Sequence, residues 1–161
     1  MCLLWLVSLP VTTISDSHSP PAASWMRRSR SIRKLYADPG YIEALTKRGD
    51  AYQLENRLDP AIADYHEALR IQPNFPDALN NLGLALATQG KYDEAVARYN
   101  EALRARPDFP DAHNNLGSAL TNQGKYSDAI SEFNEALRLQ PNNQLARENL
   151  AAVMELQKKG K

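Results

Sequence analysis

Two glycine-lysine pairs, Gly90-Lys91 and Gly124-Lys125, have the residue types of a phosphate-binding loop. In such a loop, glycine lets the backbone approach the phosphates, and a serine or threonine after the lysine binds the metal ion. Here a tyrosine follows each lysine, and the preceding glycine lies seven residues before the glycine of the pair rather than five. The spacing argues against nucleotide chemistry and indicates turns between helices.

The histidines and the cysteine lack the spacing of a catalytic or metal site. His66-Glu67 has no second histidine to complete a zinc-binding helix motif, and His18 and His113 lie far from it in the chain. Single histidines of this kind indicate polar surface. Cys2 has no second cysteine for a disulfide or a metal cluster, and no neighbouring base to activate it. We therefore expect a protein that is not an enzyme and needs no cofactor.

Composition excludes further classes of function. The chain has 161 residues, of which 43% are hydrophobic and 24% charged, which is typical of a folded protein. Nineteen basic and nineteen acidic residues give a formal net charge of zero, whereas a nucleic-acid binder needs a basic excess. No apolar run approaches the roughly 18 residues of a membrane-spanning helix. We expect neither nucleic-acid binding nor membrane insertion.

The first forty residues differ from the rest. Residues 1–41 hold five basic and two acidic side chains, and residues 42–161 hold 14 and 17. An apolar stretch opens the chain without the preceding Lys or Arg of a secretory signal, whereas residues 15–34 have the Ser-, Pro- and Arg-rich composition of an organelle transit peptide. We expect residues 1–40 to be a disordered or targeting leader, or a start wrongly assigned upstream of Met26. The expected location is cytoplasmic, with organelle or secretory targeting left open by the leader.

From Tyr41 onward a period of 34 residues governs the sequence. It is carried by Gly49, Gly83 and Gly117, by Ala61, Ala95 and Ala129, by Tyr65, Tyr99 and Phe133, by Ala68, Ala102 and Ala136, and by Pro73, Pro107 and Pro141. Aligning residues 76–109 with 110–143 gives 20 identities in 34 positions. Shared helix composition does not produce such a match, so the chain contains internal repeats.

Each repeat has the pattern of two amphipathic helices. In the second repeat, apolar residues recur every three or four positions, Gly90 supplies the left-handed conformation that ends the first helix, and Asp93 is the expected cap of the second. Asp59 and Ser127 are the expected caps in the other repeats. The expected helices are 42–55, 60–71, 76–89, 94–105, 110–123 and 128–139.

Small residues indicate where the two helices of a repeat cross closely. A side chain larger than a methyl group at Gly83, Ala95 or Ala102 would push the backbones apart, and Tyr99 is expected to fill the space beside them. A single repeat cannot bury both of its apolar faces, so the repeats must stack and end in a capping helix.

The pattern Leu-x-x-Leu-Gly-x-x-Leu, followed by Ala-x-x-x-Tyr-x-x-Ala and by Pro, resembles the tetratricopeptide repeat (TPR) family. The first repeat departs from it, with Arg48 in place of a leucine and Asn56 in place of the turn glycine. Asparagine tolerates the left-handed turn, and Arg48 suggests a terminal repeat with a polar outer face. The resemblance implies an all-α, right-handed α-solenoid of stacked helix-turn-helix units, whose first helices line a concave groove for a peptide or partner protein. The repeats would be 42–75, 76–109 and 110–143, followed by a C-terminal capping helix at 144–158.

The family register places Asn81, Asn115 and Asn149 on the groove side of successive first helices. An asparagine amide offers a donor and an acceptor, so this row would grip the backbone of an extended ligand. Similar rows occur in the arrays of O-linked N-acetylglucosamine transferases and nuclear-import adaptors. The alternative is that the asparagines only support the fold, and Lys47 breaks the row in the first repeat. The neighbours expected to select the ligand are Asp77, Asn80, Leu84, Asp111, Asn114, Ser118 and Glu148.

The same register gives the groove an acidic character. Its charged positions are Glu43, Lys47, Asp50, Asp77, Asp111, Glu148 and Glu155, six acids and one base. A field of one sign favours the opposite sign, so basic or neutral segments are the expected ligands.

The family's clamp for acidic chaperone tails needs lysine, arginine and asparagine at positions that hold Thr46, Asp50, Asn81, Asp111 and Asn115 here. Only Asn81 matches, which argues against chaperone-tail binding.

Two functions therefore remain. The first is a non-catalytic adaptor or scaffold that binds a peptide or partner protein in the concave groove. The second is a structural assembly or dimerisation module that uses the convex face or an end of the stack.

Overall fold

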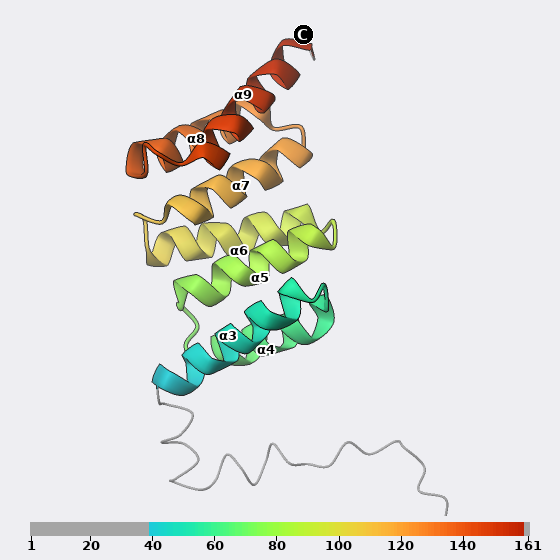
Figure 1. The fold of residues 1–161 in the computed structure, drawn as a ribbon, viewed down its shortest axis with the longest axis vertical. Helices are drawn as coiled ribbons and strands as arrows, with labels where there is room; N and C mark the ends of the chain where they lie inside the picture. Colours follow the sequence, from blue (N-terminus) through green and yellow to red (C-terminus); the bar gives the residue numbers. More distant parts are fainter. Residues whose placement is uncertain (1–38, 160–161) are drawn as a thin grey trace, which may run out of the picture. The chain divides into compact units, whose positions relative to one another are not determined.

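The computed structural model describes residues 39–159, and this part of the chain consists of helices without a strand. The helices are α3 (Pro39–Leu54), α4 (Leu58–Ile71), α5 (Pro76–Thr88), α6 (Tyr92–Ala105), α7 (Pro110–Asn122), α8 (Tyr126–Leu139) and α9 (Gln144–Lys159). They form stacked helical hairpins, with α9 at the end of the stack (Figure 1). Each second helix packs on the first helix of the next repeat as well as on its own partner. The predicted all-α stack of repeats is confirmed.

The predicted leader lies outside the described residues, except for Pro39 and Gly40, which begin α3. The helix therefore starts three residues before the predicted Ile42. A proline fits the first turn of a helix, because its fixed φ angle is helical and the missing N–H would be unpaired there anyway.

The predicted caps of the second helices are wrong. α6 begins at Tyr92 and α8 at Tyr126, so Asp93 and Ser127 lie within the first turn. The residue before α6, Lys91, makes no side-chain cap hydrogen bond. Because the helix dipole favours negative charge in the first turn, Asp93 still stabilises this end of α6.

The side chains predicted as caps connect successive repeats instead. Gln123 Nε2 donates to Asp93 Oδ1 at 2.7 Å, from the end of the next first helix. The same bond recurs one repeat earlier, from Gln89 to Asp59 at 3.1 Å. One repeat later, Gln157 donates to Ser127 at 2.9 Å.

The turns between the two helices of a repeat have the predicted left-handed residues. Gly90 and Gly124 have φ angles of +79° and +75°, and Asn56 has +57°. Asparagine is among the few side chains that tolerate this conformation, so Asn56 replaces the glycine without loss of the turn.

The close helix crossings are also as predicted. A Cβ atom added at Gly83 would lie 2.6 Å from the ring of Tyr99. Gly49 stands in the same relation to Tyr65, and Gly117 to Phe133. The three rings are fully buried, and they belong to one apolar core that continues along the stack as far as Val153.

The first repeat holds an ion pair where the others hold a leucine. Arg48 donates from Nε and Nη2 to the two carboxylate oxygens of Asp64, both at 2.6 Å. The hydrogen bonds and the negative charge of Asp64 raise the pKa of Arg48 above its usual value. Asp64 is only 7% exposed. Arg48 thus pairs with its own repeat partner α4, while its side chain remains 59% exposed, which agrees with the expected polar outer face of a terminal repeat.

The buried tyrosines predict a loss of stability at alkaline pH. Burial raises the pKa of Tyr65 and Tyr99 above the usual value, and the Asp50 carboxylate raises that of Tyr65 further. Above about pH 10 the unfolded chain releases these protons while the folded chain keeps them, so the free energy of unfolding falls. We expect a decrease of up to about 1.4 kcal/mol per tyrosine for each further pH unit, measurable by denaturant titration.

Tyr99→Phe provides the matched control, because Phe133 occupies the same position in the next repeat. This variant should retain its stability at pH 7 and lose part of the decrease above pH 10. Identical alkaline profiles of the wild type and Tyr99→Phe would contradict the prediction.

Candidate functional site

Three neighbouring pockets follow the first helices of the repeats. The first, of about 510 Å³, lies between α3, α4 and α5. The second, of about 350 Å³, reaches from α5 to α9, and the third, of about 170 Å³, lies between α7, α8 and α9. Leu84 and Thr88 line both the first and the second pocket, and Ser118, Asn122 and Asn149 line both the second and the third. The three pockets therefore form one continuous groove.

The lining of the groove is almost uncharged. Its one charged residue is Asp50, at the first pocket, and none of the lining residues is basic. Three of its leucines are exposed to solvent, Leu54 at 90%, Leu145 at 57% and Leu84 at 39%. They alternate with amide and hydroxyl side chains. The groove thus offers apolar contact together with hydrogen bonds, as ligand sites generally do.

The predicted row of asparagines lies in this groove, and each amide bonds to the preceding repeat. Asn81 donates to Asp50 at 2.7 Å. Asn115 donates to Asn80 at 3.0 Å, and Asn149 donates to Asn114 at 3.0 Å. These bonds link repeats and fix the orientation of each amide.

An asparagine carries two N–H donors and a carbonyl acceptor. Within residues 39–159, Asn115 and Asn149 each donate one N–H to the preceding repeat, and their second N–H and their carbonyl take part in no further hydrogen bond there. At Asn81 the carbonyl already accepts from Asn80 at 3.0 Å. Asn115 and Asn149 therefore retain more hydrogen-bonding capacity than Asn81 does.

The other predicted site residues divide between the groove and its surroundings. Leu84, Ser118 and Asn114 line it. Asn80 is buried and serves as the acceptor of the Asn115 amide. The structure places the remaining ones outside the lining of the groove, namely Asp77, Asp111 and Glu148.

The predicted excess of acidic charge is reduced by two bases that the register did not include, Arg106 and Lys158, in addition to Lys47, which it had already counted. Asp77 Oδ1 accepts from Arg106 Nη2 at 2.7 Å, across 29 residues of sequence. Asp50 lies 3.6 Å from Lys47. Glu155 is paired with Lys158 at 2.7 Å. The remaining acids are Glu43, Asp111 and Glu148. The groove is consequently more neutral than the count of six acids suggested.

Several lining residues escaped prediction, above all Leu54, Leu58, Thr88, Asn122 and Leu145. Helical spacing could have identified two of them. Thr88 follows Leu84 by four residues and Asn122 follows Ser118 by four, so each lies one turn further along the same face.

Other kinds of site find no support in the described region. Within residues 39–159, no three His, Cys, Asp or Glu side chains gather as metal ligands would. None of the described helices combines the length and the hydropathy needed to cross a bilayer.

Stacked hairpins with a continuous groove along their first helices define a helical-repeat protein. A model of the tetratricopeptide repeat matches residues 80–144, and a second TPR model matches residues 49–90. The chain belongs to the tetratricopeptide repeat family. TPR domains are generally protein–protein interaction modules, typically without catalytic activity.

Solved TPR structures resemble the stack. The first TPR domain of human RPAP3 is 23% identical and superposes with a TM-score of 0.74, covering 76% of this chain and 96% of that one. The first TPR of Spaghetti (RPAP3), bound to the HSP90 peptide SRMEEVD, is 22% identical with a TM-score of 0.73, covering 77% and 98%.

An O-GlcNAc transferase mutant of Thermobaculum terrenum is 26% identical with a TM-score of 0.69, covering 70% of this chain and 22% of the transferase. No match was found among curated proteins.

Proposed function

We propose that the protein is a non-catalytic adaptor that binds an extended peptide segment of a partner protein in the groove. The observation that carries this proposal is the continuous, nearly uncharged groove with amides repeated at each turn of the stack. The peptide bound to the Spaghetti TPR domain supports the assignment by analogy of fold.

The amides supply contacts that do not depend on the ligand's side chains. The second N–H and the carbonyl of Asn115 pair with the two backbone groups of one extended residue, and those of Asn149 pair with another. Because their first N–H is bonded to the preceding repeat, the amides are held in place before the ligand arrives. This lowers the entropy cost of binding.

Selectivity comes from the first pocket. Leu54, Leu58 and Leu84 surround it, and an apolar side chain of the ligand buried there contributes about 1.5–3 kcal/mol. Asp50 at the same pocket disfavours a ligand carboxylate. The preferred ligand is therefore a neutral or weakly basic segment with an apolar side chain.

Binding of an acidic chaperone tail is not part of this proposal. The clamp position Thr46 is buried, and its hydroxyl donates to the carbonyl oxygen of Ile42 at 3.0 Å, within its own helix. No basic side chain lines the groove to receive carboxylates.

The test is selection of peptides from a displayed random library by the full chain, followed by calorimetry with the selected peptide. We expect Asn115→Ala and Asn149→Ala each to weaken binding by about 1 kcal/mol, or roughly fivefold, and the double variant by roughly thirtyfold. Gln123→Ala is the matched control, because it also removes one bond between repeats, to Asp93, but lies outside the groove.

Each of these substitutions lowers stability through the lost bond between repeats, so the melting temperatures of the variants should shift alike. Only the two asparagine substitutions should affect binding. Wild-type affinity in the double variant, or selection of predominantly acidic peptides, would contradict the proposal. An obligate dimer with a buried groove, detected by light scattering, would favour the alternative of an assembly module.

A further inference from the structure

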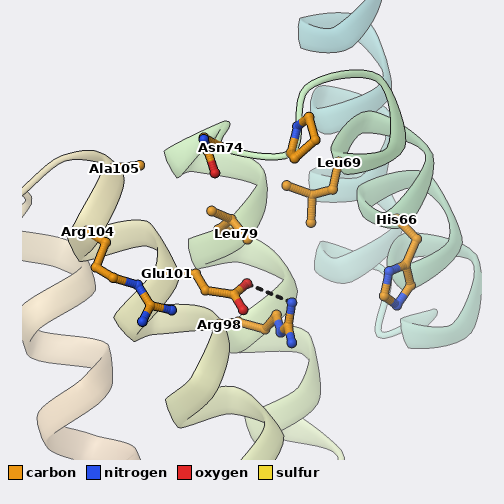
Figure 2. A pocket seen from close by; sticks show the side chains of 9 residues that line it. His66, Leu69, Asn74, Leu79, Arg98, Glu101, Arg104 and Ala105 are labelled. Atoms are coloured by element: carbon orange, nitrogen blue, oxygen red, sulfur yellow. Dashed lines mark hydrogen bonds and ion pairs between the residues drawn. The ribbon is translucent and has the colours of Figure 1, made fainter.

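A separate pocket of about 580 Å³ lies between α4 and α6, the second helices of the first two repeats (Figure 2). We call it the α4–α6 pocket. Its lining includes Leu69, Leu79, Arg98, Glu101 and Arg104.

This pocket does not belong to the groove. Leu79 contributes to the α4–α6 pocket, and Asn81 on the same helix contributes to the groove. Side chains two positions apart in an α-helix point in directions that differ by roughly 200° around the helix axis. The side chains of Leu79 and Asn81 therefore leave α5 on opposite sides. A ligand in one site therefore leaves the other accessible.

The lining combines positive charge with an apolar floor. Arg98 Nη1 donates to Glu101 Oε2 at 2.7 Å, and Figure 2 shows this pair beside Arg104. The lining thus contains two guanidinium groups and one carboxylate, which leaves a net positive charge. An arginine has five N–H donors, so Arg98 retains donors beyond the one given to Glu101. The apolar surface comes from Leu69 and Leu79.

The next repeat provides an internal comparison, since residues 34 positions further on occupy the equivalent place between α6 and α8. There His113 replaces Leu79, and Glu132 replaces Arg98. His113 Nδ1 lies 2.7 Å from Glu132 Oε2, and its Nε2 lies 3.1 Å from the carbonyl oxygen of Pro107.

The side chain of His113 is only 13% exposed, which corrects its prediction as polar surface. In this repeat the imidazole bridges Glu132 and the Pro107 carbonyl, and the arginine is replaced by an acid. The pair of arginines that lines the α4–α6 pocket is therefore not repeated between α6 and α8, where Glu132 stands in place of Arg98.

We propose that the α4–α6 pocket binds an acidic segment of a partner protein. A carboxylate of the segment pairs with Arg98 and Arg104, and a neighbouring apolar side chain packs against Leu69 and Leu79. Arginine is well suited to this role, because its planar guanidinium matches a carboxylate in a bidentate arrangement. With the groove on the other side of α5, the protein can hold two different segments at once.

The test uses the full chain and three fluorescein-labelled peptides of the form Gly-Ser-X-Leu-X-Leu-X-Ser-Gly, in which X is Glu, Gln or Lys. Fluorescence anisotropy should show the Glu peptide binding at least tenfold more tightly than the Gln peptide, and the Lys peptide not at all. The preference should shrink as salt is raised, because these side chains are partly exposed and their charges are screened.

Matched variants locate the site. Leu79→His with Arg98→Glu copies the pair that the next repeat already accommodates, and should weaken Glu-peptide binding at least tenfold. Arg104→Ala should weaken it severalfold. Arg138→Ala should leave it unchanged, because Arg138 holds the same register on α8, where it is paired with Glu135 at 2.7 Å.

The reverse exchange, His113→Leu with Glu132→Arg, should increase binding by opening an equivalent pocket between α6 and α8. No binding of the Glu peptide up to millimolar concentration would overturn the proposal. Equal effects of Arg104→Ala and Arg138→Ala would overturn it as well. Comparing these two single variants tests the proposal even if the double variants fail to fold.

Discussion

Replacing Gly83 with leucine is expected to lower the free energy of unfolding by about 1–3 kcal/mol or more, through overpacking of the α5–α6 crossing. Even the first added atom, Cβ, would lie 2.6 Å from the buried ring of Tyr99. The ring cannot retreat, because it is 1% exposed and packs within the core that joins the repeats. Denaturant titration followed by circular dichroism measures the effect.

Two further variants make this test specific. Gly83→Ala sets two opposing effects against each other. Alanine favours a helix by about 1 kcal/mol over glycine, yet we expect net destabilisation because the added methyl meets the ring. Combining it with Tyr99→Leu should cost less than the sum of the two separate losses, since the leucine removes the ring.

Ala102→Leu should destabilise like Gly83→Leu, because Ala102 is fully buried. Ala97→Leu adds the same side chain on the exposed side of α6 and should have little effect. A Gly83→Leu variant as stable as the wild type would show that the crossing tolerates a side chain.

Replacing Arg48 with leucine should also destabilise the protein, although leucine is the residue of the later repeats at this position. The substitution leaves the Asp64 carboxylate buried without its two hydrogen bonds at 2.6 Å. An unsatisfied buried charged group costs about 1–3 kcal/mol or more. Because the Arg48 side chain is itself 59% exposed, we expect the lower part of that range, again measured by denaturant titration.

The second repeat supplies the compensating change. There Leu82 stands in place of Arg48, and Arg98 in place of Asp64. Asp64→Arg removes the carboxylate that Arg48→Leu leaves without a partner, and the new arginine lies near Glu67, which also accepts from Arg70 at 2.7 Å. Arg48→Leu combined with Asp64→Arg should therefore recover most of the stability lost in Arg48→Leu. Undiminished stability of the single variant would show that Asp64 needs no partner.

The periodic features of the chain were predictable from the sequence. Spacings of 34 residues define the stacked helix pairs, since helical periodicity and glycine turns are local properties of the chain. The pairing of Gly83 with Tyr99 also followed from the sequence, because both belong to one hairpin and recur in register. The positions of Asn81, Asn115 and Asn149 in the groove were implied by the resemblance to the TPR family, whose register places them there, and not by the periodicity alone.

The tertiary structure alone decided which polar groups meet across repeats. Asp93 looks like a helix cap locally, yet its carboxylate accepts from Gln123, 30 residues further on. From the sequence, Asp77 counts as an acidic residue of the groove, but in the structure its carboxylate is paired with Arg106.

The pocket between α4 and α6 likewise could not be recognised from the repeat pattern, because its lining residues come from two repeats. Local periodicity fixes which residues share a helix face. Only the stacking of one repeat on the next fixes which side chains come within the roughly 3 Å of a hydrogen bond.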